Sequence, residues 1–203
     1  MSRAVQHNAI LLSVSLGLMM EQIDSEFLGE LLAGATWLAG ELTRLLSSSA
    51  DSPPDDSVSR TAHALSQALG LLNELVERND CDEFIDNIRE NANFVLSLCN
   101  LLWHFKPEHY DVVLPNLKRV LLDRVSESIL RLLLLCALER GYGSDTVLGL
   151  VLTNDSAGLA AVAFTLADRH QAPTVRLTAL FVLLTVACRC EAGEQFLTEL
   201  IDD

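Results

Sequence analysis

Large apolar residues recur every three or four positions through most of this chain, and this spacing restricts its fold more than any other feature. The clearest case spans residues 26–47, where one side of a helix would carry Phe27, Leu28, Leu31, Leu32, Ala35, Leu38, Leu42 and Leu45. The chain contains 41 leucines, aromatic residues make up only 5%, and no run alternates with the period of two that marks a β-strand. The sequence therefore predicts an all-α protein.

Apolar period and stop signals predict about ten helices. We expect them over about 3–20, 26–47, 59–78, 83–105, 112–123, 125–140, 145–153, 156–169, 173–190 and 192–201. Residues 48–58, rich in serine and aspartate and broken by two prolines, predict a flexible linker loop. This linker would separate a helical hairpin (3–47) from a body (59–203) within a single domain (1–203). Helical pattern continues to the last residue, as in a chain cut from a longer protein.

The charge of the chain argues against nucleic acid as a partner. The formal net charge is −14, and Lys106 and Lys118 are the only lysines. A nucleic-acid-binding surface needs a basic patch, which this sequence lacks. Solubility is the simpler interpretation of the acidity, and attraction of a basic partner is the other.

The cysteines and the apolar runs indicate an intracellular protein. Five cysteines are an odd number in a chain too long to need disulfides, and three of them lie in apolar helical runs, which favours a reducing compartment. The longest leucine-rich runs, Ile129–Leu138 and Leu177–Ala187, are shorter than the roughly 20 residues that span a bilayer. We expect a cytoplasmic or nuclear location and no membrane insertion.

No residue pattern indicates catalysis or a metal. Nucleophile, phosphate-loop, CxxC and HExxH motifs are absent from the sequence. His104 and His109 are not spaced to share one helical face, and Pro107 lies between them. We therefore expect a protein that is not an enzyme and that has no cofactor and no metal site.

The segment from Glu90 to His104 carries the most informative pattern for function. Asn93, Ser97, Asn100 and His104 would share one side of a helix, and they are short uncharged groups rather than the charged residues of an ordinary solvent face. Such a side could line a groove and bind the backbone of an extended peptide, or it could simply pack against a neighbouring helix or meet water.

Trp37 is a second candidate. It shares a helix side with Glu26, Glu30, Glu41 and Arg44, so the sequence places it on the charged side. An exposed tryptophan among carboxylates would suit a basic or amphipathic partner. The alternative, which the sequence favours, is that another helix of the same fold covers it.

Weak internal repeats point to a family of folds. Residues 62–72 align with 92–102 at an offset of 30, and Phe94-Val95-Leu96 recurs as Phe181-Val182-Leu183. Over about 59–203 the chain resembles the armadillo/HEAT class of α-solenoids. Residues 92–103 resemble the third helix of an armadillo repeat, with Asn100 where that family often carries an asparagine. Residues 173–180 resemble the start of another such helix.

The resemblance implies a right-handed superhelical stack whose third helices line a concave groove. The candidate partner-binding residues are Asn93, Ser97, Asn100, Trp103 and His104, together with Trp37, Thr178 and Thr185. One departure matters. Nuclear-import armadillo receptors place tryptophan four residues before the asparagine, whereas Trp103 follows Asn100 by three. A receptor for nuclear-localisation signals is therefore not supported.

The sequence leads to three hypotheses for function. The first is a non-enzymatic scaffold that binds a linear peptide or an amphipathic helix of another protein, and a basic segment is one alternative for that partner. The second is an assembly domain that forms a homodimer or an obligate heteromer through its leucine-rich surface. The third is a compact helical bundle with an internal ligand pocket.

Overall fold

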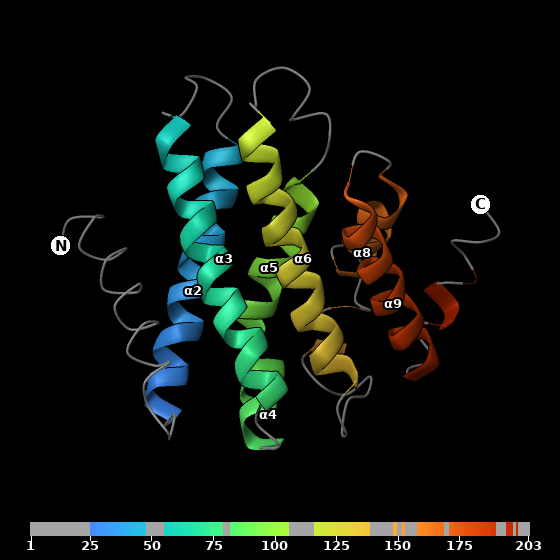
Figure 1. Cartoon of the computed structure of the whole chain (residues 1–203). Helices are drawn as coiled ribbons and strands as arrows, with labels where there is room; N and C mark the ends of the chain where they lie inside the picture. The colour runs from blue at the N-terminus through green and yellow to red at the C-terminus, as the bar shows by residue number, and fades with distance from the viewer. Residues whose placement is uncertain are drawn as a thin grey trace.

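The computed structural model describes residues 25–47, 55–78, 82–105, 116–138, 148–149, 152, 158–168, 171–189, 194–196 and 198. Helix is the only regular secondary structure among these residues, so the predicted all-α class is confirmed (Figure 1). The expected helix at 3–20 and the first part of the expected linker, 48–54, lie outside the described residues. The principal helices are α2 (Ser25–Ser47), α3 (Asp55–Arg78), α4 (Asp82–Arg89), α5 (Ala92–His104), α6 (Asn116–Leu138), α8 (Gly158–Ala167) and α9 (Pro173–Arg189).

The helices are arranged in two rows. In one row α5 lies between α2 and α8, and in the other α6 lies between α3 and α9. The rows meet where α2 contacts α3 and where α8 contacts α9. Figure 1 shows α3, α6 and α9 in front, with α2 and α5 behind. The short helix α4 contacts both α5 and α6.

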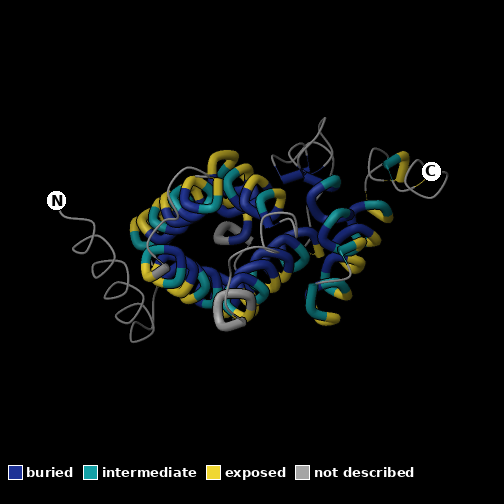
Figure 2. Tube along the Cα trace, turned by 90° about the horizontal axis from the view of Figure 1, so that it is seen from above, coloured by how far each residue is buried: buried dark blue, intermediate teal, exposed yellow. Residues whose placement is uncertain are grey.

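Apolar residues from both rows form one core between them, as the dark inner faces of the helices in Figure 2 show. Leu38 and Leu42 of α2, Leu65 and Leu69 of α3, and Ile129 of α6 are all fully buried. Burying one leucine or isoleucine side chain stabilises the fold by roughly 1.5–3 kcal/mol. Helix α2 is held against the rest of the molecule in this way.

The expected count of ten helices is wrong, because the part of the chain that the structure describes has eight. The expected helices 112–123 and 125–140 are a single helix, α6. Its residue 124 is arginine, which does not end a helix, and the buried positions Leu122, Val125, Ile129 and Leu132 form one continuous stripe across the expected break. Pro115 directly precedes this helix.

The expected helix 83–105 is divided into α4 and α5. The division falls at Glu90 and Asn91. The Asn91 side chain accepts a hydrogen bond from the Phe94 backbone N–H at 3.1 Å, which is the N-cap of α5. Asparagine caps a helix more favourably than it continues one, and this preference explains the new start.

The expected linker ends earlier than the sequence predicts. Helix α3 begins at Asp55, four residues before the predicted start at 59. The cluster of aspartates that suggests a loop instead occupies the first turn of a helix, where negative charge interacts favourably with the helix dipole. Val58, at the end of the predicted linker, is buried in the core.

Polar contacts also join neighbouring helices. Asn73 of α3 donates from Nδ2 to the backbone oxygen of Ser128 at 3.0 Å, and Arg131 of α6 donates from Nε to Glu77 Oε1 at 3.0 Å. Arg176 of α9 donates from Nε to the backbone oxygen of Leu166 at 2.8 Å. These contacts connect α3 to α6, and α8 to α9, at the edges of the apolar core.

Candidate partner-binding surface

Helix α5 has one buried side and one exposed side. Its buried residues are Phe94, Val95, Leu98, Cys99, Leu101 and Leu102. Because α5 contacts α2 on one flank and α8 on the other, only the side that faces away from the core stays open. This open side carries Asn93, Leu96, Asn100 and Trp103, which we call the α5 stripe.

The α5 stripe shares Asn93 and Asn100 with the predicted polar side, but it contains Leu96 and Trp103 in place of Ser97 and His104. Leu96 is 41% exposed and Trp103 is 38% exposed, so large apolar groups alternate with the two asparagines. Leu96 is absent from the predicted site, although its position three residues after Asn93 and four before Asn100 places it on the same side. The position of Leu96 between two asparagines of the predicted site could have identified it from the sequence.

Ser97 and His104 lie at the margin of the α5 stripe and are half-buried. Ser97 donates from Oγ to the backbone oxygen of Asn93 at 2.7 Å, and His104 Nδ1 lies 2.8 Å from the backbone oxygen of Asn100. Both side chains are therefore engaged by their own helix. The exposed amides of Asn93 and Asn100 are the polar groups of this side that remain directed to solvent.

Trp103 connects the α5 stripe to α8. Its ring centroid lies 6.0 Å from that of Phe164, and the two ring planes are tilted by 55°. Tilted aromatic pairs at this separation attract each other beyond their burial. Trp103 thus contacts the neighbouring helix while more than a third of it stays exposed.

Trp37 lies on α2, the helix next to α5, and is 36% exposed. Glu41, one turn further along, forms an ion pair with Arg44, whose Nε lies 2.8 Å from Oε2. The surroundings of Trp37 are therefore less acidic than the sequence alone suggests. Trp37 and the α5 stripe therefore lie on neighbouring helices of the same row.

Thr178 and Thr185 lie elsewhere. Both are on α9, which belongs to the row of α3 and α6. Thr178 donates from Oγ1 to the backbone oxygen of Thr174 at 3.0 Å. The structure therefore does not bring these threonines together with the α5 stripe.

The Phe-Val-Leu motif that occurs in both α5 and α9 has different buried positions in the two helices. Phe94 is fully buried and Leu96 is exposed, whereas Phe181 is 50% exposed and Leu183 is buried. The same three-letter motif thus faces in different directions on α5 and α9. Identity of letters over three residues does not fix which side of a helix meets the core.

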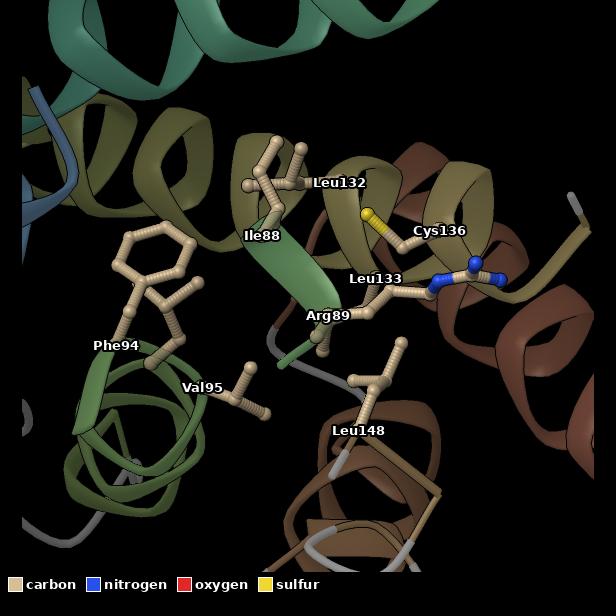
Figure 3. A pocket seen from close by; sticks show the side chains of 9 residues that line it. Ile88, Arg89, Phe94, Val95, Leu132, Leu133, Cys136 and Leu148 are labelled. Carbon is tan, nitrogen blue, oxygen red and sulfur yellow. The ribbon is translucent and has the colours of Figure 1, made fainter. Parts of the chain in front are cut away.

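A cavity between α4, α5 and α6 is too small for a ligand. It is lined mainly by apolar residues together with Arg89 and Cys136 (Figure 3), and its volume is about 10 Å³. That volume is close to the smallest that holds a single water molecule. The Arg89 guanidinium extends away from Phe94 and Val95 in Figure 3, and it forms an ion pair with Asp86.

The described cysteines have different environments. Cys99 and Cys136 are buried, Cys188 is exposed, and none of these three described cysteines forms a disulfide. Burial raises the pKa of the Cys99 thiol to about 12, so this thiol is uncharged at neutral pH and is a poor nucleophile. Within the described ranges, no three metal-binding side chains come together and no helix is long and apolar enough to cross a membrane.

Comparison with protein-family models, with curated proteins and with solved structures finds no match.

Proposed function

We propose that this chain is a non-enzymatic protein-interaction module that binds a segment of another protein along the α5 stripe. The observation that carries the proposal is the composition of that stripe: Leu96 and Trp103, about 40% exposed, alternate with Asn93 and Asn100, and the stripe contains no charged residue. Tryptophan is enriched among residues that dominate binding energy. An extended peptide or a helix would cover the apolar groups and offer hydrogen bonds to the amides.

The arrangement of the helices supports an armadillo/HEAT-like stack as the scaffold. Helices α2 and α3 would form one unit and α8 and α9 another, because the helices of each pair contact each other. Between them, α5 and α6 would form a unit through the short helix α4, which contacts both. In such stacks each unit contacts only its neighbours, and one row of helices presents a long surface. The central position of α5 in its row gives the α5 stripe an open approach between α2 and α8.

The net charge of −14 would steer a basic partner toward the chain. The α5 stripe itself is uncharged, so we propose a partner segment whose contacting side is apolar and polar and whose flanks are basic. The field of the chain would then speed association, and the contacts on α5 would set the dissociation rate.

The test begins with a random peptide library displayed on phage and selected on the immobilised chain. The affinity of a selected peptide is then measured for the wild-type chain and for the double variant Asn100→Ala and Trp103→Ala. We expect a loss of at least tenfold, equivalent to about 1.4 kcal/mol. Val120→Ala is the matched control, because Val120 is also a half-exposed apolar residue but lies on α6. Selected peptides that bind the double variant as tightly as the wild-type chain would refute the proposal.

A further inference from the structure

Helix α9 has an apolar side that no other described helix covers. Leu177, Leu180, Phe181 and Leu184 are between 36% and 53% exposed, and they are four of the largest exposed apolar side chains in the described part of the chain. The opposite side, with Val175, Ala179, Val182 and Val186, is buried against α6 and α8. We call the exposed set the α9 stripe.

The spacing of the α9 stripe is self-complementary. Its members stand at i, i+3, i+4 and i+7, so they are symmetric about a point between residues 180 and 181. If two copies of α9 pack antiparallel around a twofold axis at that point, Leu177 of one copy meets Leu184 of the other. Leu180 of each copy then meets Phe181 of the other, next to the axis. Twofold pairing of this kind is the commonest form of homo-oligomer.

Charge also favours a second copy at this surface. The chain as a whole is strongly acidic, so two copies repel each other over most of their surfaces. Helix α9 contains no aspartate or glutamate, and its arginines stand near its two ends, at 176 and 189. Arg176 is half-buried and is bonded to Leu166, away from the centre of the stripe. Two α9 helices can therefore approach each other without bringing carboxylates together.

We infer that the α9 stripe is a self-association surface, on which a second copy of this chain packs its own α9 antiparallel around a twofold axis. This role is separate from partner binding on the α5 stripe, because α5 and α9 lie in different rows. A single pair of 17-residue helices covers less than the roughly 800 Å² per partner of a standard interface. The pairing is accordingly weak, with a dissociation constant in roughly the micromolar range.

The test is sedimentation equilibrium of the whole chain at increasing concentration. Wild-type chain is expected to change from monomer to dimer between about 1 µM and 1 mM. Phe181→Glu and Phe181→Lys each place like charges near the twofold axis, so each variant alone should dimerise at least tenfold more weakly. An equimolar mixture of the two variants should recover dimerisation, and this recovery excludes misfolding as the cause of the loss. Val120→Glu, at a residue with the same 50% exposure on α6, should dimerise like wild type.

Two outcomes would overturn the inference. One is a wild-type chain that stays monomeric throughout that range, which would leave the α9 stripe to a different protein. The other is a dimer that neither Phe181 variant weakens. Orientation is checked by mild oxidation followed by peptide mapping: in the antiparallel pair the two Cys188 positions stand about 22 Å apart along the helices, at 1.5 Å per residue. A disulfide between the two copies of Cys188 would contradict antiparallel packing.

Discussion

At the scale of single residues, asparagine side chains have three different roles in this structure. Asn91 caps α5, Asn73 joins α3 to Ser128 of α6, and Asn100 stands exposed on the α5 stripe. The cap sets the residue at which α5 begins, and packing against α2 and α8 decides which of its residues face outward.

Replacing Asn91 with alanine removes the side-chain oxygen that accepts from the Phe94 N–H. We expect the free energy of unfolding to fall by about 1 kcal/mol, the usual cost of losing an N-cap. Urea denaturation followed by circular dichroism measures it. Asn93→Ala is the control, because this exposed residue lies two positions further on and should change the stability by less than about 0.5 kcal/mol. Equal effects of the two substitutions would contradict the assigned cap.

Burial of Cys99 predicts its reactivity and its effect on stability with pH. Because burial raises the pKa of this thiol from an ordinary value of 9.0 to about 12, the folded state holds the proton over a range in which the unfolded state has lost it. The stabilising contribution is complete below pH 9, and it declines as the pH rises toward 12. At pH 8, alkylation mapped by mass spectrometry should label the exposed Cys188 much faster than Cys99. Equal labelling of the two in the folded chain would contradict the burial of Cys99.

At the scale of helices, apolar packing rather than ion pairing holds α3 against α6. Ile129 is fully buried between the rows, whereas the Arg131–Glu77 pair is exposed. Ile129→Ala should lower the free energy of unfolding by about 2–5 kcal/mol. Glu77→Gln should lower it by less than about 1 kcal/mol, because exposed ion pairs contribute little. Denaturation of both variants at two salt concentrations measures the difference, and a larger effect for Glu77→Gln would reverse this ranking.

The continuity of α6 gives a sharper test of a helix boundary. Arg124 is an exposed residue inside the helix Asn116–Leu138, but it lies between the two helices that the sequence predicts. Proline there removes a backbone hydrogen bond and clashes with the preceding turn, so Arg124→Pro should cost about 3 kcal/mol or more. Arg124→Ala is the control and should be nearly neutral. A proline variant as stable as the alanine variant would show that the chain is not helical at residue 124.

The sequence predicts helix bounds well where stop signals are strong, and less well where local caps or tertiary contacts determine where a helix begins and ends. Pro173 and the apolar period place α9 correctly, and the expected 26–47 differs from α2 by one residue. The break at Asn91 depends on a helix cap. The continuity through Arg124 depends on the buried apolar side of α6, the helix that packs against α3. The predicted residues Asn93, Asn100 and Trp103 are exposed on α5, and Leu96, which is exposed beside them, was not predicted. Which row a helix joins cannot be read from its own residues, so α5 and α9 look alike in sequence and lie apart in space.

At the scale of the whole molecule, two rows of helices leave two different outer surfaces. The row of α2, α5 and α8 carries the α5 stripe with its neighbouring Trp37, and the row of α3, α6 and α9 carries the α9 stripe. The first mixes amides with aromatic and aliphatic groups, as expected of a site for a segment of another protein. The second is purely apolar and self-complementary. One scaffold could in this way hold a partner and pair with its own copy.

The central claim is that a partner covers the α5 stripe, and Trp103 reports it directly. The chain has two tryptophans, so Trp37→Phe leaves Trp103 as the single fluorophore of that kind. We would titrate this variant with a peptide selected on the wild-type chain and follow both tryptophan emission and its quenching by acrylamide. The account predicts a shift of the emission to shorter wavelength and a reduced quenching constant, both saturating with the affinity measured independently for the same variant. A peptide that saturates the chain while Trp103 emission and quenching stay unchanged would place the binding site elsewhere and contradict the account.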